Sequence, residues 1–397
     1  MAEWRECTLD SVCSRLSSGK GISAKLISEN GAYPVYGGNG IRGFTDTSNF
    51  KGDCAIIGRQ GAYCGNVRYF RGEAYMTEHA VVVCANADNC TRYLAYLLST
   101  MNLGRLSGQS AQPGLSVKTL GKQKIRLPDK NVQLKCAELL GSLDEKISYN
   151  EEINENLLQQ ATTIFKSWFV DFNPFNEPMI EAPTGYQVPE SLKMVQIQNL
   201  PHILETGKRP KGGAVSEGIP SVGAENVKQL GLFDESSAKY IPHDFASSMK
   251  KGKIEGYELL LYKDGGKPGT FTPHFSMFGE GFPYEEFYIN EHVFKLDFFD
   301  RGYNEFAYLY MQTDYPYHWL ANNGGKAAIP GINQQNVNEL WIYHPSHPLV
   351  QKFCKWVQPL FTIIFTNCAQ NMKLSKLREI LLPKLMSGEL DVSNLDL

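Results

Sequence analysis

The sequence predicts an α+β protein in which two pseudo-repeated α/β domains are separated by two long antiparallel helices that form a coiled coil. Three observations support this prediction. The chain contains a long proline-free stretch with a heptad pattern, a second copy of that pattern near its end, and similar loops and strands before both copies. Its 397 residues are enough for two hydrophobic cores, so each copy can belong to a domain of its own.

The first stretch, residues 131–172, contains no proline and only Gly141 as a glycine. Such a composition permits a helix of about 40 residues, roughly 60 Å long at about 1.5 Å per residue. Apolar residues recur along it at alternating spacings of four and three. This narrow stripe is typical of a coiled coil, whereas an ordinary surface helix has a wider apolar face. Asn150 and Asn154 lie in the stripe.

The second stretch repeats this stripe, with Asn367 and Asn371 at the matching positions. A buried asparagine lowers the stability of a coiled coil but fixes its register, because it needs a polar partner on the facing helix. Antiparallel pairing would set Asn150 against Asn371 and Asn154 against Asn367. The alternative is a pair of unrelated core helices, which would not explain why the repeat extends beyond the helices.

Two residues of the second helix depart from the expected pattern. Arg378 occupies a core position, where Asp144 or Glu145 of the first helix can neutralise it. Pro359 is expected to bend the second helix or to begin it, and Gly141 stands near the equivalent place in the first helix.

The repeat also extends upstream of both helices. Residues 108–128 align without a gap to residues 325–345, and both segments contain a proline-glycine pair and end on a proline. Further upstream, Glu78-His79 matches Glu291-His292, while residues 58–65 resemble residues 262–269 more weakly. The chain is therefore expected to be a duplication with four segments: a first domain over 1–128, a first long helix over 129–172, a linker and second domain over 173–345, and a second long helix over 346–390.

Each domain has the pattern of a small α/β fold. Runs rich in β-branched residues predict strands, and segments with one apolar face predict helices. In the first domain the strands are residues 53–58, 80–84 and 123–127, with a helix at 91–101. In the second domain the strands are residues 257–262, 293–296 and 339–343, with a helix at 302–313.

Composition limits the class of protein. No long apolar run and no basic-then-apolar start exist, so neither a membrane span nor a signal peptide is expected. The nine cysteines have no metal-type spacing, so we expect reduced thiols in a cytoplasmic protein and no metal site. The net charge of −3 argues against a strongly cationic DNA binder. The first domain is nevertheless basic and the second acidic, so phosphate affinity in the second must come from local clusters or partners.

Glycine-rich loops of both domains carry basic, amide and tyrosine side chains. Side chains on loops that project from a rigid sheet can contact the base edges and phosphates of double-stranded DNA, although ordinary solvated turns have the same composition. The candidate contact residues are Arg42, Arg59, Gln60, Tyr63 and Gln109 in the first domain, and Lys208, Arg209, Lys211, Lys263, Lys267, Asn323 and Lys326 in the second.

No catalytic motif is complete. Asn173-Pro174-Phe175 lacks the second proline of an amino-methyltransferase motif and has no glycine-rich cofactor loop before it. Pro128-Asp129 and the later Asp144 have the spacing of a nuclease, but such an enzyme needs its carboxylates around a metal, and Asp144 lies in the predicted coiled coil. We expect no catalytic residue and no cofactor in this chain. The alternatives are a nuclease or methyltransferase with divergent motifs and a two-headed protein-binding adaptor.

Residues 139–175 resemble the central conserved region of the specificity subunit of type I restriction–modification systems, and residues 330–345 resemble the end of a target recognition domain of that family. The resemblance covers the whole chain but is weak inside the two domains. It implies two target recognition domains, each of which reads half of a split asymmetric DNA sequence, with the helices as a spacer. It also implies a non-catalytic subunit in phage defence. The implied partners are two methyltransferase subunits, which bind S-adenosylmethionine, and motor-endonuclease subunits.

Overall fold

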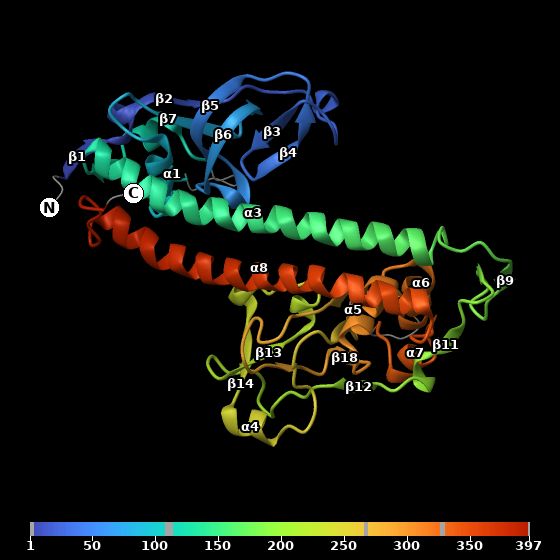
Figure 1. The fold of residues 1–397 in the computed structure, drawn as a ribbon. Helices are drawn as coiled ribbons and strands as arrows, with labels where there is room; N and C mark the ends of the chain where they lie inside the picture. The colour runs from blue at the N-terminus through green and yellow to red at the C-terminus, as the bar shows by residue number, and fades with distance from the viewer. Residues whose placement is uncertain (1–3, 108–113, 266–268, 326–329, 396–397) are drawn as a thin grey trace. The chain divides into compact units, whose positions relative to one another are not determined.

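The computed structural model describes residues 4–107, 114–265, 269–325 and 330–395. The chain divides into two compact units: unit 1 comprises Met1–Lys146 and Leu374–Leu397, and unit 2 comprises Ile147–Lys373. The division falls inside the two 40-residue helices, α3 (Lys130–Phe169) and α8 (Pro348–Ser387), so each unit contains part of both (Figure 1). Because α8 continues from Pro348 through Pro359, Pro359 does not begin the second helix.

Unit 1 is built on a six-stranded sheet with the order β2-β7-β5-β6-β3-β4. Helix α1 (Thr91–Ser99) covers one face of the sheet, where Tyr93 and Leu94 are buried against Ala55 and Ile57. The strands are β2 (Cys13–Ser18), β3 (Tyr33–Gly37), β4 (Gly40–Thr45), β5 (Phe50–Gly58), β6 (Val67–Met76) and β7 (Ala80–Ala85). A separate antiparallel pair joins β1 (Arg5–Thr8) to β8 (Lys124–Leu127), with the short helix α2 (Val117–Gly121) before β8.

Gly141 of α3 leaves space for the side chain of Arg92 from α1. A Cβ atom at this position would lie 2.4 Å from Cζ of Arg92. The Arg92 guanidinium instead donates to the Gly141 carbonyl at 3.1 Å and forms an ion pair with Glu145 at 2.6 Å. The glycine in the first long helix therefore makes room for an arginine of the sheet-covering helix.

Unit 2 repeats the core of unit 1. Its four-stranded sheet has the order β12-β18-β15-β16, which corresponds to β2-β7-β5-β6. These strands are β12 (Ile203–Thr206), β18 (Val293–Asp297), β15 (Leu259–Tyr262) and β16 (Phe275–Ser276). Helices α5 (Arg301–Tyr310) and α7 (Gln334–Asn338) stand where α1 and α2 stand in unit 1, and β11 (Met194–Gln196) pairs with β19 (Trp341–Tyr343) as β1 pairs with β8. The prediction of two similar α/β domains is confirmed.

The three-stranded sheet of unit 2, β14 (Lys239–Ile241), β13 (Ile219–Val222) and β17 (Tyr288–Ile289), matches β4-β3-β6 of unit 1, because in both the first pair is antiparallel and the second is parallel. Unit 2 also contains elements without a counterpart in unit 1: the hairpin of β9 (Met179–Glu181) and β10 (Gln187–Pro189), and helices α4 (His243–Ser248) and α6 (Asp314–Gly324). These insertions explain why the sequences of the two domains align only near their ends and around two loops.

The four asparagines of the stripe hold α3 against α8 in unit 2. Asn150 Nδ2 lies 2.8 Å from Asn371 Oδ1 and 2.8 Å from Gln370 Oε1. Asn367 Nδ2 donates to Asn154 Oδ1 at 2.9 Å. These are the pairs that an antiparallel coiled coil requires, because the residue numbers rise along one helix as they fall along the other.

In unit 1 the two helices are tied by charge and by the C-terminal segment. Arg378 Nη1 lies 2.9 Å from Asp144 Oδ1, which confirms that a carboxylate of the first helix neutralises this core arginine. Beyond α8 the chain turns back, and the Ser393 carbonyl accepts a hydrogen bond from Lys135 Nζ at 2.7 Å. Val392 is buried in the same core, so this segment completes unit 1.

Candidate nucleic-acid interface

Loops from four parts of unit 1 are hydrogen-bonded together around Arg59. The Arg59 amide donates to the His79 carbonyl at 3.0 Å, and the Leu115 amide donates to the Arg59 carbonyl at 2.8 Å. His79 belongs to the Glu78-His79 turn between β6 and β7, and Leu115 lies just before α2. The end of β2 completes the group, because Arg59 Nη1 donates to Ser18 Oγ at 3.4 Å.

Unit 2 has the same arrangement around Lys263. The Lys263 amide donates to the His292 carbonyl at 2.9 Å, and the Ile332 amide donates to the Lys263 carbonyl at 2.7 Å. The next residues also correspond, because Gln60 forms a β-bridge with Gly114 as Asp264 does with Gly331. We call these groups the loop clusters: residues 18–20, 59–60, 78–79 and 114–115 in unit 1, and residues 206–208, 263–264, 291–292 and 331–332 in unit 2.

The structure brings four of the five predicted contact residues of unit 1 to this loop cluster or beside it. Arg59 is half-buried and Gln60 exposed, and Tyr63, in the 3-10 turn Gly61–Tyr63, is 46% exposed. Arg42 is exposed on β4 and packs over Gly37. A Cβ on the neighbouring Gly38 would meet the His79 carbonyl oxygen at 3.2 Å, so this hairpin touches the cluster. The fifth residue, Gln109, lies outside the described residues.

In unit 2, two of the predicted contact residues are bonded to acidic neighbours. Arg209 Nε lies 2.9 Å from Glu291 Oε1, and Lys263 Nζ donates to the Glu291 carbonyl at 3.0 Å and lies 3.7 Å from Asp264 Oδ2. The acidic residues are themselves bonded to His292, through Nδ1 to Asp264 and through Nε2 to Glu291 at 3.3 Å. Arg209 and Lys263 are therefore less available to phosphate than their sequence suggests.

The remaining predicted residues of unit 2 fall into three groups. Lys208 and Lys211 are exposed after β12, and neither forms an ion pair within the part of the chain that the structure describes. Asn323 lies on α6, half-buried, and donates to the Trp319 carbonyl at 2.9 Å. Lys267 and Lys326 lie outside the described residues.

Sequence reasoning missed one basic residue of the unit 1 cluster, Lys20. It follows Ser18-Gly19 at the end of β2, as Lys208 follows Thr206-Gly207 at the end of β12. The repeated pattern of a hydroxyl residue, glycine and lysine could have revealed it. The surrounding sequences differ too much for the repeat to stand out without the strand pairing.

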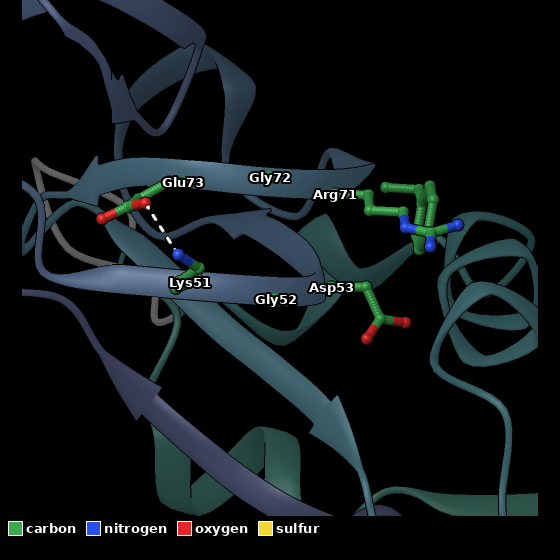
Figure 2. A pocket seen from close by; sticks show the side chains of 7 residues that line it. Lys51, Gly52, Asp53, Arg71, Gly72 and Glu73 are labelled. Atoms are coloured by element: carbon green, nitrogen blue, oxygen red, sulfur yellow. Dashed lines mark ion pairs between the residues drawn. The ribbon is translucent and has the colours of Figure 1, made fainter.

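A separate hollow of about 630 Å³ opens on the β5–β6 ladder (Figure 2). The strand register sets Gly52 opposite Gly72, between the pair Lys51 and Glu73 and the pair Asp53 and Arg71. The hollow stays open because both glycines, at φ +128° and +146°, lack side chains. Each basic residue faces an acidic one, so these walls carry no net charge. The hollow therefore lacks the positive field that attracts phosphate.

Within the part of the chain that the structure describes, we looked for a metal site, a reactive thiol and a membrane-spanning helix. No group of three or more histidine, cysteine, aspartate and glutamate side chains there is arranged to hold a metal ion. Burial raises the pKa of the Cys13 and Cys54 thiols to about 12, so both stay protonated and weakly nucleophilic near neutral pH. Among the same residues, no helix is long and apolar enough to cross a membrane.

Comparison with known proteins points to one family. A family model for the type I restriction modification DNA specificity domain matches residues 1–159. The EcoprrI specificity subunit of Escherichia coli is 40% identical over 159 residues, or 38% of this chain and 40% of that protein, so this match spans less than half of the relative. The MjaIX specificity subunit of Methanocaldococcus jannaschii is 29% identical over 328 residues, which are 77% of this chain and 70% of that protein.

A solved structure shares the fold of nearly the whole chain. The crystal structure of the type I restriction–modification system S subunit from M. genitalium aligns with 97% of this chain and 96% of its own, with a TM-score of 0.66. The two sequences are 18% identical over this alignment, so the likeness concerns the fold.

Proposed function

We propose that the chain, which is similar to type I restriction–modification specificity subunits, is the DNA sequence-recognition subunit of such a system and has no catalytic activity of its own. Each unit reads one half of a bipartite, asymmetric target through its loop cluster. The observation that carries this proposal is the duplication of the cluster, with Arg59 in one unit where Lys263 stands in the other.

The two clusters share a backbone frame and differ in the side chains that the frame presents. Hydrogen bonds between main-chain atoms hold the frame, so residues with different side chains, such as Arg59 and Lys263, can occupy the same position in it. Gln60 in unit 1 corresponds to Asp264 in unit 2, and an amide and a carboxylate prefer different base edges. A common frame with different side chains suits two domains that read different half-sites.

The proposed complex contains partners that supply what this chain lacks. Two methyltransferase subunits bind S-adenosylmethionine and methylate the target, and motor-endonuclease subunits complete a cytoplasmic restriction complex. A chain of net charge −3 has too little positive charge to hold a DNA duplex alone, so the partners contribute much of the phosphate contact. The paired helices α3 and α8 act as the spacer that sets the distance between the half-sites.

Mapping of methylated sites in cells that express the complex tests the proposal. We expect one split target, methylated only when this chain is present. In the assembled methyltransferase, Arg59→Ala should relax one position in one half-site, and Lys263→Ala should do so in the other. A side chain that bonds a base edge accounts for about 1–3 kcal/mol of discrimination. If both variants keep their affinity and sequence preference, the assignment of the loop clusters is wrong.

Two further measurements separate this proposal from its alternatives. The purified chain alone, mixed with DNA, a divalent metal and labelled S-adenosylmethionine, should neither transfer methyl groups nor cleave. Either activity would favour the divergent enzyme. The second measurement uses the complex with the methyltransferase subunits. If this chain is an adaptor that binds only proteins, it should add nothing to the affinity of those subunits for duplex DNA, whereas DNA recognition predicts an added affinity that falls steeply as salt concentration rises.

A further inference from the structure

Lys20 and Lys208 occupy the same place in the two units. β2 ends on Ser18, which pairs with Val81 of β7, and β12 ends on Thr206, which pairs with Phe294 of β18. In both units a glycine and then a lysine follow the strand. Lysine is therefore retained at this position although the flanking residues, Gly21 in one unit and Arg209 in the other, differ.

The glycine before each lysine is pressed against the backbone of the strand that leads into the Glu-His turn. A Cβ on Gly19 would lie 2.1 Å from the Met76 carbonyl oxygen, and one on Gly207 would lie 1.6 Å from that of Ile289. Backbone atoms cannot move aside for a side chain, so both positions require glycine. The contact fixes the chain directly before the lysine in each unit.

Hydrogen bonds hold the same segments. The Gly19 amide donates to the Ala80 carbonyl at 3.0 Å and the Lys20 amide to the Met76 carbonyl at 2.9 Å. In unit 2 the Gly207 amide donates to the Asn290 carbonyl at 3.2 Å. Each lysine side chain therefore starts from a fixed point beside the Glu-His turn of its own loop cluster.

The lysine side chains themselves are available to a ligand. Both are exposed, and neither forms an ion pair with a described residue. Lys263 of the unit 2 cluster and Arg209 beside it differ, because they are bonded to Glu291 or Asp264. Lys20 and Lys208 are thus the basic residues that the two clusters share and that acidic neighbours leave free.

We infer that Lys20 and Lys208 are the residues by which each unit grips the DNA backbone, in the same way on both half-sites. This inference rests on the proposed function and deepens it. Two domains that read different half-sites need not share any base contact, whereas the phosphates they meet are the same in every sequence. A residue kept at the same place in both units suits that common contact, and a lysine is a mobile point charge suited to phosphate.

The experiment uses the complex of this chain with its methyltransferase subunits. Its affinity for cognate duplex and for scrambled duplex is measured between about 50 and 200 mM salt, the range over which phosphate contacts change affinity most visibly. The variants are Lys20→Ala, Lys208→Ala and the double variant, with Lys20→Arg and Lys208→Arg as charge-preserving variants. Lys122→Ala and Lys193→Ala are the matched controls, because both lysines are exposed and lie outside the loop clusters.

Each alanine variant should make the slope of log affinity against log salt concentration less steep by about 0.9, and the double variant by about 1.8. Affinity should fall by the same factor on cognate and scrambled DNA, and the methylated sequence should not change. The arginine variants and the two controls should keep the wild-type slope. Thermal unfolding midpoints should match the wild type, because the substituted side chains are exposed.

Three outcomes would overturn the inference. An unchanged slope in both alanine variants excludes a phosphate contact. A loss confined to cognate DNA, with one relaxed position, would make the lysine a base reader instead. A wild-type complex with no affinity for duplex DNA would overturn the proposed function as well, which separates the failure of the two ideas.

Discussion

Asn150 donates a hydrogen bond to Asn371 at 2.8 Å from a side chain that is fully buried between the two long helices of unit 2. Asn150 Nδ2 also bonds Gln370, while Asn150 Oδ1 accepts no hydrogen bond from a described residue. The pairing of Asn150 with Asn371 therefore fixes the register of the two helices but leaves one polar atom without a hydrogen bond. A loss of stability of this kind is expected of a buried asparagine in a coiled coil.

Asn150→Leu alone should destabilise the chain by about 1–3 kcal/mol, because it leaves the half-buried side-chain oxygen of Asn371 without its donor. Adding Asn371→Leu should recover much of this loss, since two apolar side chains then face each other. Urea unfolding of the two single variants and the double variant measures the coupling. Gln159→Leu, at an exposed position of the same helix, is the control. Additive effects of the two leucines would contradict this account.

Because of the contact between Arg92 and Gly141, the substitution Gly141→Ala should lower stability, whereas glycine-to-alanine substitutions in helices usually raise it. In an open helix position, alanine is more stable than glycine by about 1 kcal/mol. At Gly141 the new Cβ would displace the Arg92 guanidinium from the Gly141 carbonyl and from Glu145.

Gly141→Ala should therefore lower stability in the wild-type chain and raise it by about 1 kcal/mol in an Arg92→Ala background. Chemical unfolding of the four chains of this cycle gives the coupling energy, expected at about 1–2 kcal/mol for residues in direct contact. A coupling energy near zero would mean that Arg92 moves aside without loss.

Glu305 is expected to make the stability of unit 2 sensitive to pH. Its side chain is fully buried on α5, where burial raises its pKa from 4.5 to about 8 in spite of the ion pair with Arg301 at 3.2 Å. Between these two values the folded chain holds a proton that the unfolded chain has lost. Stability should therefore fall as pH rises through this window, by at most about 1.4 kcal/mol per pH unit.

Glu305→Gln keeps the shape of the side chain and removes its titration. Thermal unfolding from pH 5 to about pH 8 should show a smaller loss of stability in this variant, with the difference from the wild type growing as pH rises. Glu280→Gln, on an exposed residue of the same unit, should leave the wild-type profile unchanged. If stability changes with pH in the same way in Glu305→Gln and in the wild type, then Glu305 is charged in the folded chain, or is protonated equally in the folded and unfolded chains.

The proposed spacer role predicts that helix length sets the gap in the DNA target. Inserting four residues after Asn150 and four after Asn367 keeps the stripe near register and lengthens each helix by about 6 Å. This length is close to two base pairs at roughly 3.4 Å each. Methylation mapping should find the same half-sites with a wider gap, and weaker binding, because four residues also add a rotation of about 40°.

A matched insertion separates this effect from general disruption. Four residues placed after Gly185, a positive-φ turn with open space around it, should leave the gap unchanged. An active complex with four extra residues in each helix and an unchanged gap would show that the helices do not act as the spacer.

The sequence by itself determined the architecture of this protein. The two long helices follow from a four-three apolar stripe, although Gly141 lies inside the first helix and Pro359 inside the second, and their register follows from two asparagines in each stripe. Both signals are local, because the residues that carry them lie within a few turns of one another. The duplication was also readable, because the segments before the helices, such as those ending at Pro128 and Pro345, align without a gap. One detail was wrong: Pro359 was a possible start of the second helix, whereas α8 begins at Pro348 and continues through Pro359.

Only the tertiary structure decided which residues the loop clusters bring together. Arg59 meets His79 and Leu115 through backbone hydrogen bonds across the sheet and the loops, and no local pattern encodes such long-range partners. The same holds for the acidic partners of Arg209 and Lys263, and for Arg92, which explains the glycine in α3. Lys20 was missed because its equivalence to Lys208 depends on strand pairing. A residue's role in a site depends on neighbours distant in sequence, and packing of the sheet chooses those neighbours.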